Sequence, residues 1–121
     1  MRDFKKYDVW GMSHSLTLKV YKETMQLPNS EKYGLISQIQ RAAYSIPSNI
    51  VEGCGRDSDK EFNRFLQMSL GSANELEYFM ILCADLGFMD RDVSHSLQEE
   101  IKVIKRQIIN LSKKLKIDSR Q

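Results

Sequence analysis

The stretch SQIQRAAYSIPSNIVEGCGR, from Ser37 to Arg56, decides how the chain folds. At about 100° per residue on a helix, its apolar side chains and that of Leu35 occupy an arc of about 100°, the width of a stripe that faces a core. The stripe consists of Leu35, Ile39, Ala42, Ala43, Ile46 and Ile50. The stretch therefore predicts an amphipathic helix. Pro47 predicts a kink in it, because proline has no N–H to donate to the carbonyl of Ala43.

A row of hydrogen-bonding side chains lies beside this stripe. The row consists of Gln38, Arg41, Ser45, Asn49 and Glu52. Because buried polar groups must be paired, we expect Arg41 to join a buried or interfacial network with a carboxylate, either Glu52 or Glu75. Such a network would fix which helices pair. We favour this structural role for the row over an active site.

The third face of the same helix carries no charge. It consists of Tyr33, Ser37, Gln40, Tyr44, Pro47 and Val51. A helix with so few charges is usually covered on more than one side, either inside one larger bundle or at a subunit interface. A chain of 121 residues has too few layers to enclose a helix. We therefore expect a homo-oligomer whose interface contains Tyr33, Gln40, Tyr44 and Val51.

Three other segments repeat apolar residues at spacings of three and four, which is typical of amphipathic helices. The four predicted helices cover residues 8–25, 31–53, 58–86 and 91–116. The connections are short and no strand signal occurs. We therefore predict the all-α class: one antiparallel up-down four-helix bundle with a kinked second helix, assembling into a homo-oligomer. The single domain spans residues 1–121, with residues 1–7 as an arm and 117–121 as a basic tail.

Residues at the predicted helix ends support these boundaries. Ser58 and Glu61 have the spacing of a capping box, in which each side chain satisfies a backbone donor of the other residue. Asp8 can cap the first helix. Either Gly53 or Gly55 can take the left-handed conformation that ends a helix.

The charges are unevenly distributed along the chain. The net charge is +2, yet from Lys102 onward seven basic residues face a single acidic residue, Asp118. Six of the basic residues fall on the outward arc of the last helix: Lys102, Lys105, Arg106, Lys113, Lys116 and Arg120. This pattern indicates an anionic partner. The arc has no aromatic residue for base stacking, so binding to RNA or DNA would depend on phosphates. The alternative interpretation is an ordinary solvated helix face.

No set of residues indicates catalysis. Asp92 and His95 form a single i, i+3 pair, whereas a di-metal bundle needs such a pair on each of two helices. Cys54 and Cys83 have no metal-binding spacing and are typical of reduced thiols in the cytoplasm. No segment resembles a signal peptide or is apolar for long enough to span a membrane. We therefore predict a cytoplasmic protein with no catalytic residues, metal, cofactor or membrane association.

The order of residues resembles a known family. S-Q-I-x-R-A-x-x-S-I-x-x-N-I-x-E-G-x-G-R begins at Ser37, F-x-x-F-L begins at Phe62, and G-S-x-x-E-L-E begins at Gly71. This pattern resembles small four-helix bundle proteins encoded in intervening sequences of bacterial large-subunit rRNA genes, historically labelled ribosomal proteins. The resemblance runs from about Tyr7 to Leu115. It implies a bacterial, cytoplasmic protein whose family has no assigned activity.

That family is also similar to the accessory variability determinant of diversity-generating retroelements. The determinant is a pentameric barrel of four-helix subunits whose basic surface engages nucleic acid and a reverse transcriptase. The resemblance thus implies a pentamer as the homo-oligomer. We predict a non-enzymatic oligomer that binds nucleic acid with low specificity through its basic face. The alternative is a protein-binding scaffold or accessory subunit for a partner enzyme such as a reverse transcriptase.

Overall fold

The computed structural model describes the backbone of residues 2–119 and the side chains of residues 2–116. Within this part of the chain there are four α-helices and no strand. The helices are α1 (Asp8–Thr24), α2 (Ser37–Cys54), α3 (Asp59–Asp85) and α4 (Arg91–Ser119). The all-α prediction is confirmed. The predicted boundaries lie close to those observed, except at the start of the second helix.

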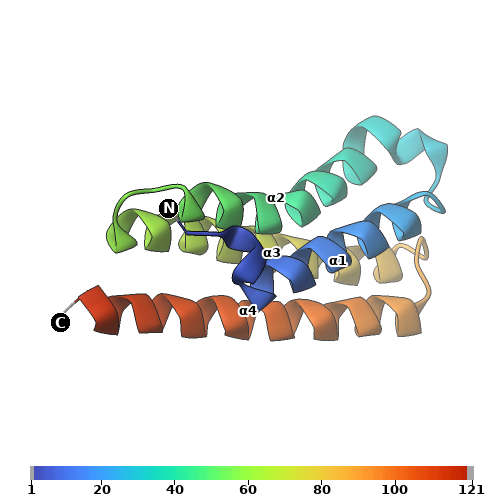
Figure 1. Ribbon diagram of the computed structural model, residues 1–121. Coiled ribbons are helices and arrows are strands. Elements are labelled where there is room, and N and C mark those ends of the chain that lie inside the picture. Colours follow the sequence, from blue (N-terminus) through green and yellow to red (C-terminus); the bar gives the residue numbers. More distant parts are fainter. Residues whose placement is uncertain (1, 120–121) are drawn as a thin grey trace.

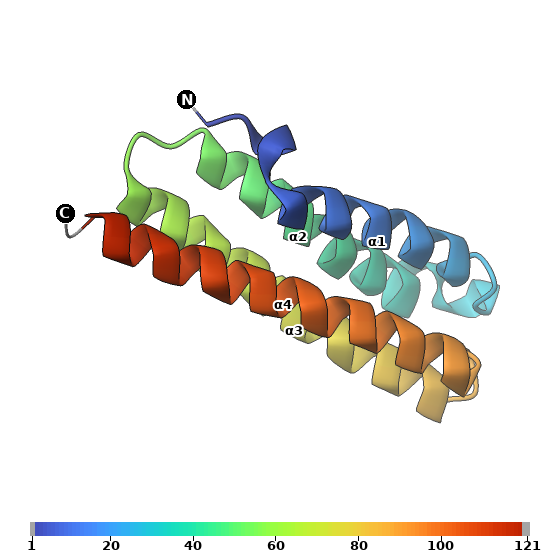
Figure 2. The ribbon, with the colours of Figure 1, turned by 60° about the horizontal axis from the view of Figure 1, so that its bottom comes forward.

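Consecutive helices run in opposite directions (Figures 1 and 2). The most extensive packing is between α2 and α3 and between α3 and α4, and α1 packs mainly against α2. Contact between α1 and α4 is the sparsest of the neighbouring pairs. The first described residues and the C-terminal end of α4 lie toward the same end of the molecule (Figures 1 and 2). These contacts confirm the predicted up-down bundle.

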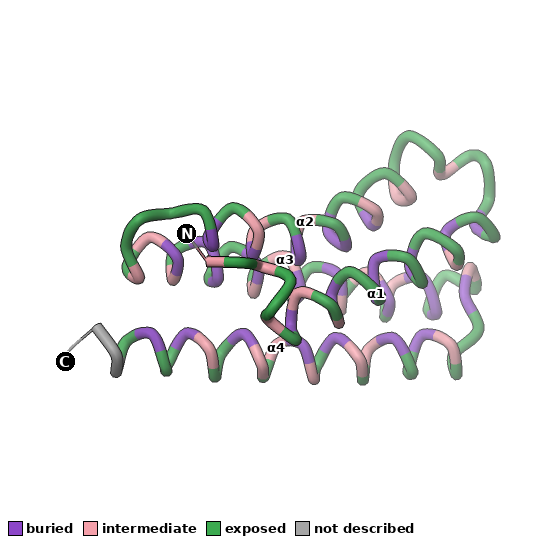
Figure 3. The backbone as a smooth tube through the Cα atoms, viewed as in Figure 1, coloured by how far each residue is buried: buried purple, intermediate pink, exposed green. Residues whose placement is uncertain are grey.

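The core lies along the inner stripes of the four helices (Figure 3). Every residue of the predicted α2 stripe is buried except Leu35, which is partly buried and precedes α2. Among the residues with the largest fully buried side chains are Leu16, Val20, Ile39, Ile46, Ile50, Phe62, Leu66, Leu76, Met80, Ile101, Ile104 and Ile108. Each helix therefore contributes an apolar stripe to one shared core.

The predicted start of the second helix, residue 31, is wrong. A 3₁₀ turn at Asn29–Glu31 and a π-helical turn at Lys32–Ile36 precede α2. No side chain caps either turn, and Gly34 is a poor helix former. The regular α-helix consequently begins at Ser37.

The predicted kink at Pro47 is confirmed. The helix is continuous through Pro47, and α2 changes direction in its middle (Figure 1). The hydroxyl of Thr17 in α1 donates to the carbonyl of Ala43 across 3.2 Å, replacing the N–H that proline lacks. From the other side, the Ser69 hydroxyl in α3 donates to the carbonyl of Ile46 across 2.9 Å. The kink is therefore supported by both neighbouring helices.

The helix starts follow the predicted chemistry at one position and not at another. The Ser58 side chain accepts a hydrogen bond from the N–H of Glu61 at 3.1 Å, which confirms Ser58 as the cap of α3. The reciprocal bond of the predicted capping box is not formed within the described residues, because the Glu61 carboxylate pairs with Arg64 at 3.4 Å. Asp8 does not cap α1. It lies in the first turn, and Tyr7 occupies the capping position without a side-chain hydrogen bond. In the first turn, the negative charge of Asp8 still interacts favourably with the positive end of the helix dipole.

The prediction that a left-handed glycine ends α2 is wrong. Gly55 has a right-handed conformation with φ of −83°, and within residues 2–119 only Gly87 has a positive φ, 76°. Gly53 has a different role, because it is buried inside α2 against α3. A Cβ atom on Gly53 would lie 2.7 Å from Cδ1 of Phe62 and 3.0 Å from Cβ of Phe65. Glycine here permits close packing of two helices.

The predicted N-terminal arm is docked on the bundle. It contains a 3₁₀ turn at Phe4–Lys6. The Arg2 guanidinium donates to the carbonyl of Arg56 at 2.9 Å, forms an ion pair with Asp59, and lies over the Phe62 ring at 4.7 Å. The arm thereby covers the connection between α2 and α3.

Candidate nucleic-acid interface

Helix α4 has a buried seam and an exposed basic face. The seam residues Leu97, Ile101, Ile104 and Ile108 are buried. Away from the seam, four predicted phosphate-binding residues are exposed: Lys102, Arg106, Lys113 and Lys116. Arg120 lies outside the described residues. We refer to the exposed side of α4 from Lys102 to Lys116 as the basic face.

Lys105 does not belong to the basic face, and its predicted outward orientation is wrong. Its side chain is mostly buried, with Nζ 2.6 Å from Oε1 of Glu77 and 2.9 Å from Oδ1 of Asn74. Both partners are on α3. An ammonium held by a carboxylate in this way is less available to a phosphate. The contacts of Lys105 instead join α4 to α3.

Lys102, Arg106 and Lys113 are bound less tightly than Lys105. Lys102 lies 3.3 Å from Glu99 one turn away, an exposed pair of the kind that contributes little. Arg106 and Lys113 have no hydrogen-bond or ion-pair partner among residues 2–116. These two side chains are therefore free to approach an external anion.

The structure places an aromatic residue next to the basic face that the sequence interpretation missed. Tyr78 on α3 is 56% exposed. It follows Asn74 by one helical turn, and Asn74 contacts Lys105 of α4. The sequence of α4 contains no sign of this ring, because Tyr78 belongs to the exposed side of the neighbouring helix α3.

The predicted polar network of α2 is not present in buried form. Gln38, Arg41, Glu52 and Glu75 are exposed, and Ser45 and Asn49 are partly buried. Two local contacts occur: Asn49 Nδ2 donates to the Ser45 carbonyl at 2.8 Å, and Glu52 pairs with Arg56 at 3.3 Å. Within residues 2–116 no hydrogen bond or ion pair joins Arg41 to Glu52 or Glu75.

The interfacial form of that network stays a prediction. The contact of Ser69 with Ile46 fixes the register of α2 against α3. The two helices are antiparallel, so five residues before Ile46 on α2 correspond to five residues after Ser69 on α3. Arg41 therefore lies level with Asn74, which is next to Glu75. The structure thus brings Arg41 and Glu75 to the same level of the bundle, where a neighbouring subunit could contact both.

Two of the four predicted interface residues line an apolar groove. Tyr44, which is 46% exposed, and Val51 form part of a groove of about 430 Å³ between α1 and α2. From α1, this groove is lined by Trp10, His14, Thr17, Leu18 and Tyr21. We call it the α1–α2 groove. Gln40 instead donates to the Thr24 hydroxyl at 3.1 Å, and Tyr33, 90% exposed, lies in the π-helical turn.

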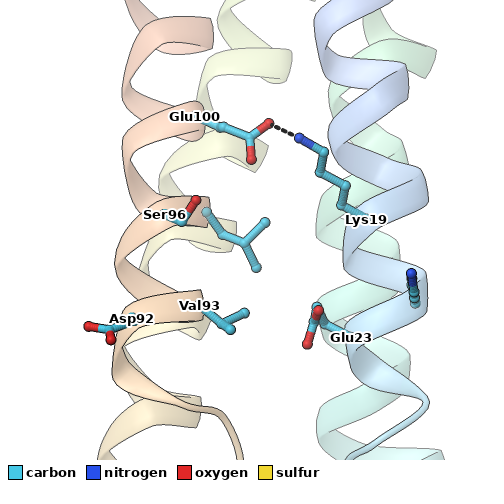
Figure 4. Close-up of a pocket in the computed structure, with 8 residues that line it drawn as sticks. Lys19, Glu23, Asp92, Val93, Ser96 and Glu100 are labelled. Carbon is cyan, nitrogen blue, oxygen red and sulfur yellow. Dashed lines mark hydrogen bonds and ion pairs between the residues drawn. The ribbon is translucent and has the colours of Figure 1, made fainter.

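A second groove, of about 420 Å³, separates α1 from α4 (Figure 4). Lys19 and Glu100 bridge it with an ion pair of 2.8 Å. Its remaining charged residues are Lys22, Glu23 and Asp92. Because charges of both signs line this groove, it favours no simple anion or cation.

The two cysteines do not have the properties of catalytic thiols. Cys54 and Cys83 are buried, and burial raises the pKa of both thiols, whereas reactive cysteines have a lowered pKa. His95 is exposed, with Nε2 3.8 Å from Oε1 of Glu99. In residues 2–116, no three His, Cys, Asp or Glu side chains gather as a metal site. None of the helices in this part of the chain could cross a membrane.

The fold and these surfaces define a class: an all-α four-helix bundle with a basic face on α4 and an apolar groove between α1 and α2. The sequence pattern of the 23S rRNA-intervening sequence proteins matches residues 5–110. The chain belongs to this family, as its residue order predicted. No curated protein matches the chain.

A solved structure supports the same assignment. It is the crystal structure of a protein with unknown function from the S23 ribosomal protein family of Bacteroides thetaiotaomicron VPI-5482. The two chains superpose with a TM-score of 0.80 and are 26% identical, over 87% of this chain and 95% of that chain. The similarity to the retroelement determinant stays a prediction.

Proposed function

We propose that the protein is a non-enzymatic, cytoplasmic homo-oligomer that binds RNA or DNA through the basic face of α4. The observation that carries this proposal is the division of charge along α4. Between Lys102 and Lys116 the helix has no acidic residue and six basic residues, one of which, Lys105, is bound to Glu77 of α3. Arg106 and Lys113 are exposed there without a partner among the described residues. Nucleic acid is the polyanion that such a face would contact most extensively.

The expected mode of binding follows from the residue types. Lysine and arginine on a helix surface neutralise phosphates and release their counterions. Phosphate contacts carry no direct sequence information. We therefore expect weak sequence preference and a strong dependence on salt.

Replacing Arg106 and Lys113 together by glutamine should weaken binding of single-stranded RNA. Loss of two phosphate contacts should flatten the slope of log K against log salt by roughly 1.4, because each contact contributes roughly 0.7 on a single strand. Fluorescence anisotropy of a labelled oligonucleotide, titrated at several salt concentrations, measures this slope. Helicity should be unchanged, since both side chains are exposed.

The matched control is the double variant Lys22→Gln and Lys32→Gln, which removes two exposed charges from outside α4. It should leave the slope nearly unchanged. An equal loss in both variants would mean that only the total charge matters. Absence of salt-dependent binding by the wild type at about 50 mM salt, where phosphate-driven binding is strong, would overturn the proposal.

We propose further that the subunits meet at the α1–α2 groove, with a pentamer favoured by the family resemblance. Tyr44→Glu should reduce the oligomer size measured by light scattering, because the change buries a carboxylate in an apolar contact. Asn110→Glu, at an exposed position on α4, is the control and should leave the size unchanged. A monomeric wild type, or an oligomer that tolerates Tyr44→Glu, would contradict this proposal.

The α1–α2 groove also favours a second candidate function. If it remains open in the assembled protein, its apolar lining, including Trp10 and Leu18, would suit a partner protein. The protein would then be a scaffold or an accessory subunit for an enzyme such as a reverse transcriptase. A reverse transcriptase gene beside this one would favour this role, and a position inside an rRNA gene would favour the intervening-sequence class.

A further inference from the structure

An exposed aromatic ring stands beside the cations of the basic face. Tyr78 projects from α3 with more than half of its surface exposed. Its only ring contact among the described residues is a tilted one with Phe79, at 6.1 Å between centroids. One side of the Tyr78 ring is therefore accessible to a planar ligand.

Three side-chain contacts fix where Tyr78 lies along α4. Between α3 and α4, Gln67 donates to Ser112 at 3.1 Å, Lys105 donates to Asn74 at 2.9 Å, and Ser94 donates to the Met80 carbonyl at 2.7 Å. Because the helices are antiparallel, the step of four residues from Asn74 to Tyr78 on α3 corresponds to the step of four residues from Lys105 to Ile101 on α4. Residues four apart share a helix face. Tyr78 consequently lies level with Ile101, next to Lys102.

From this level the free cations extend in one direction along α4. At about 1.5 Å per residue, Arg106 lies about 6 Å and Lys113 about 16 Å farther along the helix axis than Lys102. A strand that stacks a base on Tyr78 can therefore run along the basic face with its phosphates toward these cations. The aromatic ring and the cations form one continuous track.

The acidic residues near the track are mostly neutralised. Glu77 is bound by Lys105 at 2.6 Å, and Glu99 pairs with Lys102 at 3.3 Å. Glu75 is exposed. Around the axis of α3, Tyr78 lies between Glu75 and Glu77, and Glu77 is the residue that contacts α4, so Glu75 lies on the side away from α4. The negative charges thus do not separate Tyr78 from the basic face.

We infer that the ligand of this face is a single-stranded nucleic acid, with one base stacked on Tyr78 and the following phosphates bound along α4. This inference rests on the proposed function and specifies its substrate. Aromatic side chains stack on bases of any sequence, and such stacking adds substantially to single-strand affinity. In a duplex the bases stack on each other, so the ring would contribute nothing.

The test compares a labelled oligouridine strand with an RNA hairpin duplex of equal charge, by fluorescence anisotropy. Tyr78→Ala should lower affinity for the single strand by about fivefold or more and leave duplex affinity unchanged. Tyr78→Phe should bind like the wild type, because stacking needs only the ring. Tyr33→Ala, which removes an exposed tyrosine from the π-helical turn between α1 and α2, is the matched control and should bind normally.

A second readout reports contact directly. The chain has one tryptophan, Trp10, so the double variant Trp10→Phe and Tyr78→Trp has a single reporter at the proposed stacking position. Its fluorescence should be quenched by oligouridine and not by the hairpin. The helicity of each variant, measured by circular dichroism, excludes misfolding as the cause of lost binding.

Two outcomes would overturn the inference. If Tyr78→Ala binds both probes like the wild type, or loses affinity equally for both, then Tyr78 does not stack on a base, although salt-dependent binding by α4 would stand. If the wild type binds neither probe, the proposed function fails and this inference fails with it. Oligothymidine in place of oligouridine shows whether the strand is RNA or DNA.

Discussion

Replacing Gly53 by alanine is expected to lower the free energy of unfolding by about 1–3 kcal/mol. The added methyl would approach Cδ1 of Phe62 to 2.7 Å, Cβ of Phe65 to 3.0 Å and the Phe62 carbonyl oxygen to 3.2 Å. Phe62 is completely buried, so its ring has no room to move aside. The helices α2 and α3 would have to separate, and the packing between them would be lost.

Gly71→Ala is the control and should have the opposite sign. Gly71 is exposed in the middle of α3, and nothing lies within 4 Å of a Cβ built on it. Alanine is the better helix former by about 1 kcal/mol, so this variant should be more stable than the wild type. Urea denaturation at fixed protein concentration measures both effects. If Gly53→Ala and Gly71→Ala are destabilised equally, the close packing of α3 against Gly53 is not the cause of the destabilisation.

Thr17→Val is expected to lower the free energy of unfolding by about 1–3 kcal/mol, the cost of leaving a buried carbonyl without a donor. Valine has nearly the same shape as threonine but has no hydroxyl. In the wild type this hydroxyl shares its single proton between the Ser13 carbonyl at 2.8 Å and the Ala43 carbonyl at 3.2 Å. Only the Ala43 carbonyl depends on it, because Pro47 has no N–H.

A double-mutant cycle with Pro47→Ala isolates this role. Alanine at position 47 restores an N–H that can donate to the Ala43 carbonyl. Thr17→Val should therefore cost less in the Pro47→Ala background than in the wild type, by about 1 kcal/mol. Equal costs in the two backgrounds would show that the threonine stabilises the protein through packing and not through the kinked helix.

The fold could be predicted from the sequence because each helix depends on local periodicity. Ile39, Ile46 and Ile50 share one face of any α-helix, whatever surrounds it. The capping role of Ser58 is equally local. The π-helical turn before Ser37 was not predictable in this way, because it depends on how an uncapped helix end accommodates the packing of α2 on α1.

The candidate site could be predicted only in part, because it depends on contacts between helices. Angular position on an isolated α4 put Lys105 on the outward arc, but its long side chain reaches Glu77 of α3. The proximity of Tyr78 to α4 was hidden for the same reason, since it follows from the register of two antiparallel helices. The exposure of Arg41 likewise depends on how α2 packs against α1 and α3, which the sequence of α2 alone does not contain.

The division of charge along α4 also gives the bundle an electrical polarity. Asp92, Glu99 and Glu100 lie toward one end of α4, and the lysines up to Lys116 lie toward the other, where the first described residues of the chain also lie (Figure 1). In the field of a polyanion such a particle experiences a torque as well as an attraction. It should rotate its positive pole toward the strand before any contact forms, so that productive orientations are over-represented among its encounters.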